Sequence, residues 1–381
     1  MAGIYIHYPF CVRKCFYCDF YSETELGLSD KFIESLLEEI AIRQNTKPYS
    51  KEIETIFIGG GTPSLIKPAN LEKLIKLLDS VFDIEDNAEF TIECNPGTTD
   101  INNFTEYRSF GVNRLSIGVQ SFNDNELKFL QRIHSSGKAE EAINAARNAG
   151  FDNLSVDLIF SIPGQTAESW NNTLNTTLSH APEHISAYSL IYEEGTPLFE
   201  QEKAGKIKKI PENKDLMMYR LLQDSLAAKG YEQYEISNFA LGGKKCRHNL
   251  NYWYSGDYLA FGPAAHGFED GQRYWNVSNI HEYLKMSANG ELPLEGSEKP
   301  DKTQRMEEII FLGLRAEGFK SAYLEEQTGY SLKHSFNLLK KLENEGLLEM
   351  RKGFIKLTQK GYLLADEISY KMIEKLTEQV N

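Results

Sequence analysis

The first half of the chain alternates short runs of β-branched and aromatic residues with longer amphipathic stretches. We predict strands for Gly3–His7, Glu54–Ile58, Glu89–Glu93, Arg114–Val119, Leu154–Ile159 and His184–Leu190. Apolar residues recur at helical spacing between them, in Ser29–Gln44, Pro68–Val81, Asp100–Phe110, Gly137–Ala149 and Thr166–Leu178. Repeated strand–helix units form a parallel sheet with helices outside it. Residues 1–190 are therefore predicted to be α/β, either an open doubly wound sheet or an incomplete barrel.

The pattern changes after residue 190. Residues 191–298 are irregular, aromatic and glycine-rich, with one helix predicted near Asp215–Lys229. The segment Lys244–Phe268 is dense in His, Asn, Tyr, Trp and Gly, and we predict an ordered loop system there rather than a core element. The polar residues Glu295–Pro300 indicate a linker.

Residues 299–381 form a third predicted domain. Its pattern is helix, short helix, helix, strand pair and helix, with the first five elements at Lys302–Arg315, Ser321–Gln327, Ser331–Glu345, Leu347–Met350 and Phe354–Leu357. This order is typical of a winged helix. From Pro300 onward, 13 Lys and Arg stand against 13 Asp and Glu, so a packing or protein-contact module is favoured over DNA binding.

Three cysteines fall within eight residues, at Cys11, Cys15 and Cys18. A structural zinc site needs a fourth ligand close at hand, which Asp19 or His7 could supply. A four-iron cluster needs only three thiolates, and its fourth iron then stays open for a small ligand. Aromatic residues surround the loop and would shield such a cluster from solvent. We predict a [4Fe-4S] cluster on these three cysteines.

Polar or glycine residues follow five consecutive predicted strands. They are the cysteine loop, Gly59-Gly60-Gly61-Thr62-Pro63, Glu93, Gln120 and Asp157. In a barrel of parallel strands the carboxyl ends meet at one mouth, where ligands bind. Glycine lets the backbone approach a ligand closely. This convergence favours the incomplete barrel over the open sheet.

The formal net charge of −14 argues against a general nucleic-acid binder and against adhesion to anionic lipid. No apolar run approaches the roughly 18 residues of a membrane span, and the N-terminus lacks a secretory signal. We therefore expect a cytoplasmic protein, in a compartment where thiols stay reduced.

The cysteine spacing resembles that of the radical S-adenosylmethionine superfamily, which implies an incomplete (β/α)6 barrel. In that superfamily the open iron binds S-adenosylmethionine. Within it, the chain is similar to the oxygen-independent coproporphyrinogen III oxidase family and its heme chaperone branch, HemW. The resemblance covers nearly the whole chain and rests on five motifs: Tyr5–Cys11, Phe57–Ser64, Glu93–Gly97, Ser116–Phe122 and Asp157–Gly164.

The resemblance also implies which residues bind the cofactors. Those carried over to the S-adenosylmethionine site are Tyr5, Tyr17, Gly60, Gly61, Thr62, Glu93, Gln120, Arg132 and Asp157. The segment His248-Asn249-Leu250-Asn251-Tyr252-Trp253 matches the HNxxYW pattern of the heme chaperone branch, so His248 is a predicted heme-binding residue. Taken without the family, a lone histidine among aromatic residues is more often a hydrogen-bonded structural residue than a ligand.

Two features separate the two branches. The oxidases have a fourth cysteine two residues after the third and an extension before the first strand, whereas this chain has Phe20 there and begins its strand at Gly3. The expected function is thus a heme chaperone that holds heme, the cluster and S-adenosylmethionine. Its expected partners are an electron donor and acceptor hemoproteins such as membrane respiratory enzymes. An anaerobic coproporphyrinogen III oxidase and a metal-sensing regulator that acts through the winged helix remain alternatives.

Overall fold

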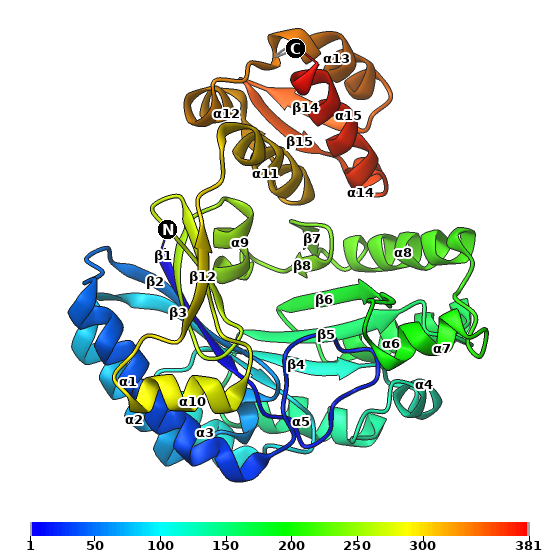
Figure 1. Cartoon of the computed structure of the whole chain (residues 1–381). Helices are drawn as coiled ribbons and strands as arrows, with labels where there is room; N and C mark the ends of the chain where they lie inside the picture. Colours follow the sequence, from blue (N-terminus) through cyan, green and yellow to red (C-terminus); the bar gives the residue numbers. More distant parts are fainter. Residues whose placement is uncertain (1, 379–381) are drawn as a thin grey trace.

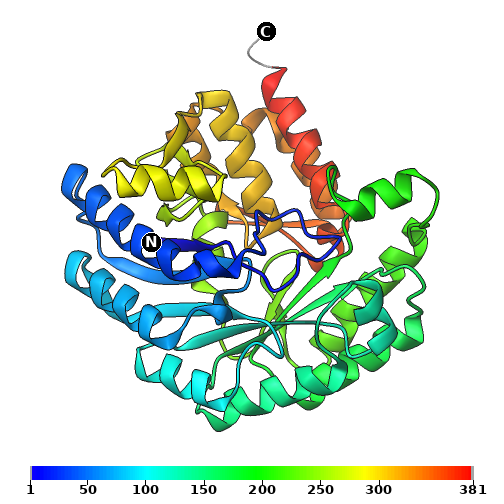
Figure 2. The same ribbon diagram turned by 60° about the horizontal axis from the view of Figure 1, so that its bottom comes forward.

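In the computed structural model, which describes residues 2–378, a curved parallel sheet carries helices on its outer face (Figures 1 and 2). Six parallel strands lie side by side in chain order: β1 (Ala2–Tyr8), β2 (Ile53–Gly60), β3 (Ile84–Cys94), β4 (Arg114–Gln120), β5 (Leu154–Phe160) and β6 (His184–Ser189). The connecting helices are α1 (Ser29–Thr46), α2 (Pro68–Val81), α3 (Ile101–Ser109), α4 (Asp124–Phe129), α5 (Ser136–Asn148) and α6 (Ala167–Ser179). The predicted strand–helix alternation of this half is confirmed.

The sheet continues beyond these six strands at both edges. On the β6 side, helices α7 (Pro197–Lys203) and α8 (Glu212–Ala227) lead to two short antiparallel strands, β7 (Glu232–Gln233) and β8 (Asn238–Ala240). On the β1 side lie, in chain order, α9 (Arg247–Trp253), β9 (Asp257–Phe261), β10 (His266–Glu269), β11 (Gln272–Asn276), α10 (Ile280–Ala288) and β12 (Leu294–Glu298). The sheet therefore has twelve strands among the described residues.

Two predictions for this middle region are wrong. Lys244–Phe268 is not a loop system, because β9 pairs in parallel with β1 and buries Leu259 and Phe261 in the main core. Glu295–Pro300 is not a linker, because most of it belongs to β12, which pairs with β11 at the sheet's edge. An edge strand that is mostly exposed needs no apolar alternation, so its polar sequence gave no strand signal.

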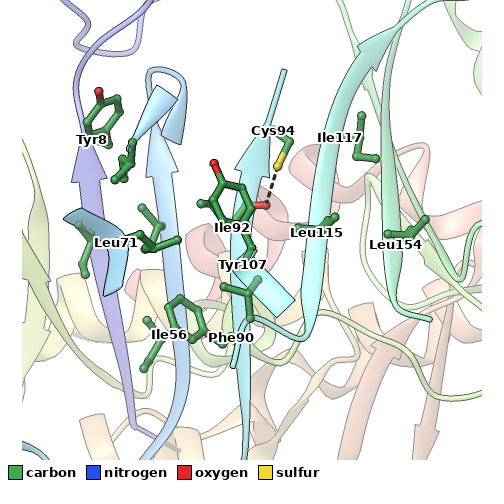
Figure 3. Close-up of a cluster of buried hydrophobic side chains, with 14 of the residues drawn as sticks. Tyr8, Ile56, Leu71, Phe90, Ile92, Cys94, Tyr107, Leu115, Ile117 and Leu154 are labelled. Carbon is green, nitrogen blue, oxygen red and sulfur yellow. Dashed lines mark hydrogen bonds between the residues drawn. The ribbon is translucent and has the colours of Figure 1, made fainter. Parts of the chain in front are cut away.

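The main core lies between the sheet and its outer helices. Figure 3 shows part of it, where Ile56, Ile92 and Leu115 from neighbouring strands meet Leu71 of α2 and Tyr107 of α3. These five side chains are nearly or completely buried. Apolar burial on this scale stabilises the sheet and holds the carboxyl ends of its strands in fixed positions.

The C-terminal domain has its own core and stands at the opposite end of the sheet from the loop that follows β1 (Figure 1). Its elements are α11 (Lys302–Arg315), β13 (Phe319–Lys320), α12 (Ser321–Thr328), α13 (Phe336–Asn344), β14 (Leu348–Arg351), β15 (Phe354–Leu357), α14 (Gln359–Tyr362) and α15 (Ala365–Thr377). The helices and three-stranded sheet give the predicted winged-helix-like arrangement. None of the described helices is long and apolar enough to cross a membrane.

Candidate functional site

The three clustered cysteines lie on one loop that begins where β1 ends. Backbone hydrogen bonds close the base of this loop, from Cys11 N to Glu23 O at 2.8 Å and from Glu23 N to Pro9 O at 2.7 Å. Cys11, Cys15 and Cys18 are partly exposed, whereas the other two cysteines of the chain are buried. The loop therefore presents three accessible sulfur atoms from a segment that is tied down at both ends.

Two cavity residues donate hydrogen bonds to these sulfurs. Thr62 Oγ1 lies 3.4 Å from Cys11 Sγ, and Arg132 Nη1 lies 3.6 Å from Cys15 Sγ. Such donors favour the thiolate form that iron requires. Burial raises the pKa of Cys18 to about 11, so this thiol must release its proton when it binds a metal.

The donor set fits a cubane. Among the side chains that the structure describes, no three of His, Cys, Asp or Glu are grouped closely enough to hold a single metal ion. A four-iron cluster makes no such demand, because its three thiolates bind three different irons. Three thiols on one anchored loop, backed by Thr62 and Arg132, are suitable ligands for that cluster.

A cavity of about 690 Å³ runs from the cysteine loop into the barrel. It is lined by Cys18 and by every residue that the sequence predicted for cofactor binding: Tyr5, Tyr17, Gly60, Gly61, Thr62, Glu93, Gln120, Arg132, Asp157 and His248. Cys11 and Cys15 lie beside it through their contacts with Thr62 and Arg132. Residues from β1 to β5 and from α9 thus meet in one space.

Several polar residues of this cavity were not predicted from the sequence. Four alternate residues of β4, Arg114, Ser116, Gly118 and Gln120, all line it. Alternation along a strand puts such residues on one face, so the period of two could have identified Arg114 and Ser116. Gln120 adopts a φ of 66°, a left-handed conformation that is uncommon for a non-glycine residue and clusters at functional sites.

Two mostly buried carboxyl groups share the cavity. Asp157 accepts hydrogen bonds from Ser116 Oγ at 2.8 Å and from Ser155 Oγ at 2.9 Å. Glu93 accepts one from Gly60 N at 3.2 Å. Burial, and secondly the charge of Asp157, raises the pKa of Glu93 to about 8. The carboxylate oxygens of Asp157 and Glu93 can pair with a cationic ligand. Because the pKa of Glu93 is about 8, this residue loses its proton near neutral pH.

The glycine turn after β2 packs directly on the start of the cysteine loop. A Cβ at Gly61 would lie 2.7 Å from Phe10 O and 2.8 Å from Pro9 C, which are backbone atoms. We therefore expect Gly61→Ala to push the loop outward and to lower the iron retained after anaerobic reconstitution severalfold. Gly27→Ala is the matched control, because nothing lies within 4 Å of the added carbon and iron content should not change. Equal iron in both variants would contradict this packing argument.

His248 is completely buried, and both of its ring nitrogens are engaged inside the fold. Nδ1 lies 2.8 Å from Thr55 Oγ1, and Nε2 lies 2.7 Å from the Tyr252 hydroxyl. The ring also stacks on Phe57, with centroids 5.2 Å apart. Burial lowers the pKa of His248 to about 3, so the ring is neutral. It can ligate a metal only after one of these hydrogen bonds is broken.

Helix α9, which carries the HNxxYW segment, is held by Glu89 of β3. The Glu89 carboxylate accepts hydrogen bonds from the backbone N–H groups of Arg247 at 3.0 Å and His248 at 3.1 Å. It thereby caps the first turn of the helix from another element. Nothing in the local sequence indicated this role, because Glu89 and α9 are about 160 residues apart.

Phe20 replaces the fourth cysteine of the oxidase pattern and lines the mouth of the cavity. It is 65% exposed. Tyr188 and Ile191, which are 43% and 61% exposed, line the same cavity. The mouth is therefore partly apolar, and it holds no thiol at position 20.

Comparisons with known proteins show the family of this chain. The model of the radical SAM superfamily matches residues 5–177, and that of the HemN C-terminal domain matches residues 301–364. The heme chaperone HemW of Bacillus subtilis is 36% identical over 97% of this chain and 98% of its own length. HemW of Mycobacterium tuberculosis is 32% identical over 96% and 93%, and HemW of Escherichia coli is 39% identical over 71% of each chain.

One solved structure resembles the whole chain. The radical SAM coproporphyrinogen III oxidase HemN from Escherichia coli has a TM-score of 0.83, with 23% sequence identity, and the match covers 97% of this chain and 89% of that one. The shared architecture confirms the predicted fold class.

Proposed function

The chain belongs to the HemW family within the radical SAM superfamily, and from that premise we propose that it is a heme chaperone. In this proposal it binds heme, a [4Fe-4S] cluster on Cys11, Cys15 and Cys18, and S-adenosylmethionine, and it delivers heme to acceptor hemoproteins. The naming of its relatives supports this function, because relatives that match most of the chain are described as heme chaperones.

One structural observation carries the proposal. The cysteine loop and the HNxxYW segment are more than 220 residues apart, yet Cys18 and His248 line the same cavity. A protein that coordinates heme handling with a redox-active cluster needs these two regions to be close. We propose that His248 belongs to the heme-binding region. His248 contacts this region through the Tyr252 hydroxyl, which lies 2.7 Å from its Nε2.

The remaining cavity residues suit S-adenosylmethionine. When bound, the cluster supplies an electron and an open iron. Glu93 and Asp157 offer carboxylates to a cationic amino-acid head, and Arg132 offers a guanidinium group to its carboxylate. The glycine turn lets the backbone approach the ligand closely.

Coproporphyrinogen oxidation is the second candidate, because the solved oxidase shares the fold. Phe20 disfavours it, since this position holds cysteine in the oxidase pattern. An anaerobic assay of the reconstituted protein with coproporphyrinogen III, S-adenosylmethionine and a reductant separates the two functions. We expect no protoporphyrinogen, and steady turnover would replace the chaperone proposal by an oxidase.

Heme binding is tested by titrating the purified chain with heme and following the Soret band. We expect saturable binding of about one heme per chain in the wild type. Transfer is then tested by mixing the loaded protein with an apo-hemoprotein and following the acceptor's own spectrum. A Soret band that stays that of free heme throughout would refute the chaperone function.

We further propose that the protein works in the cytoplasm, with an electron donor for the cluster as an additional partner. Fractionation of cells followed by immunodetection tests this location.

A further inference from the structure

A second cavity lies on the far side of Tyr252. This groove, of about 620 Å³, is formed by β9, β10 and β11 of the sheet and by α11 and α15 of the C-terminal domain. Tyr252 lines both the groove and the barrel cavity. The HNxxYW segment therefore forms a wall between two spaces, with His248 on the barrel side.

The walls of the groove are aromatic. They carry five rings, from Tyr252, Tyr258, Phe268, Phe311 and Tyr370. The ring centroids of Tyr252 and Tyr258 are 4.5 Å apart, and those of Phe311 and Tyr370 are 5.9 Å apart. The Tyr370 residue is 65% exposed. Several aromatic side chains around a concave site of this size are typical of a binding site for a flat, apolar ligand.

Two guanidinium groups, those of Arg273 and Arg305, also line the groove. Glu308 holds them together, through Arg273 Nη2 and, at 3.3 Å, Arg305 Nη1. Arg305 also lies over the Phe268 ring, 5.3 Å from its centroid. Arg273 Nη1 also pairs with Glu298 at 2.5 Å, and Arg305 Nη2 lies 3.2 Å from the Tyr323 hydroxyl. An arginine has five N–H donors, so each group still has donors left for a further carboxylate.

We propose that this groove is the heme-binding surface: the macrocycle packs against its aromatic walls and the propionates pair with Arg273 and Arg305. The proposal rests on the proposed chaperone function and locates its heme-binding site in the structure. Heme offers both required features, a flat apolar face and two carboxylates at one edge. Among the described residues that line the groove, none is a histidine or a cysteine, so the iron-binding groups that it offers are tyrosine phenols and the carboxylates of Glu307 and Glu308.

The groove also removes a conflict inside the barrel. His248 has both nitrogens engaged, and the barrel cavity has to hold S-adenosylmethionine next to the cluster. A heme in the groove needs neither the His248 ring nor that volume. It still contacts the HNxxYW segment through Tyr252.

The test is a set of heme titrations on the full-length protein. Tyr370→Ala and Arg305→Ala are expected to weaken heme binding about tenfold each. The matched controls are Tyr188→Ala, an exposed tyrosine of the barrel cavity, and Arg351→Ala, an exposed arginine of the same domain outside the groove. Both controls should keep wild-type affinity. Circular dichroism and thermal melting of each variant establish that it is folded.

Heme with esterified propionates supplies the second arm, because it cannot form the carboxylate pairs. It should bind the wild type and Arg305→Ala with similar affinity, while Tyr370→Ala should still weaken it. Unchanged heme affinity in both groove variants, or a loss of affinity confined to Tyr188→Ala, would show that the groove does not bind heme. The proposed chaperone function would not be affected by that result. Failure of the wild type to bind heme would overturn the chaperone function itself.

Discussion

Replacing Cys15 by serine is expected to abolish the cluster. After anaerobic reconstitution with iron and sulfide, the variant should retain almost no iron and lack the broad cluster absorbance, whereas the wild type should bind close to four irons. The physical reason is that a serine hydroxyl is a far weaker iron ligand than a thiolate. Two remaining thiolates leave two irons of the cubane open instead of one.

The matched control is Cys94→Ser. Cys94 is buried at the end of β3, and its thiol contacts the backbone carbonyl of Ile92 at 3.8 Å rather than the cysteine loop (Figure 3). This variant should keep full iron content. Equal iron loss in the two variants would mean that the thiol count, rather than the loop, decides binding, and the cluster assignment would fail.

Replacing Glu93 by glutamine is expected to weaken S-adenosylmethionine binding at least tenfold, because the amide cannot pair with the ligand's ammonium group. In the wild type, Glu93 must lose its proton before it can form this pair, and its pKa in the free protein is about 8. Affinity should therefore rise by up to about tenfold per pH unit between pH 6 and 7.5. Calorimetric titrations at several pH values measure this, and the variant should show no such dependence.

The same substitution should have the opposite effect on stability. In the unfolded chain the carboxyl ionises near 4.5, whereas in the folded protein it stays protonated up to about 8. The folded state thus binds the extra proton, and its stability falls as the pH rises from 4.5 to 8. A neutral amide escapes this loss. Glu93→Gln should match the wild type at pH 4.5 and exceed its stability at pH 8 by about 2–3 kcal/mol, which is less than the full linkage value because buried sites relax.

Glu235→Gln separates these two effects. Burial likewise raises the pKa of Glu235 to about 8, but this residue does not line the barrel cavity. The variant should gain stability at alkaline pH and keep its affinity for S-adenosylmethionine. Wild-type affinity in Glu93→Gln would remove Glu93 from the ligand site, whatever its stability.

Local patterns made the first half of the chain predictable. Pro68–Val81 is a helix with the predicted bounds, and five of the six predicted strands are part of longer strands, while the sixth ends one residue earlier than predicted. In a strand or an amphipathic helix, apolar residues recur with a period of 2 or 3.6 residues, so the local sequence shows which face is buried. Since parallel strands end at one edge, the strand pattern also predicted that residues as distant as Gly60 and Asp157 meet at one mouth, and both line the cavity.

Long-range pairing was not predictable in this way. β9 is a strand of the sheet because it pairs with β1, which is more than 250 residues away. The periodicity of a local segment does not show which distant strand it will pair with. The polar edge strand β12 likewise depends on β11.

By itself, the sequence determined the strand–helix alternation, the cysteine loop and the convergence of polar residues at the strand ends, because each depends on local spacing. The tertiary structure alone decided the environment of His248. Thr55 and Tyr252 occupy its two nitrogens, Glu89 caps its helix, and Tyr252 divides the barrel cavity from the groove. Apart from the His248–Tyr252 contact within α9, these contacts join residues far apart in the chain, and the packing of α9 against the sheet brings them together.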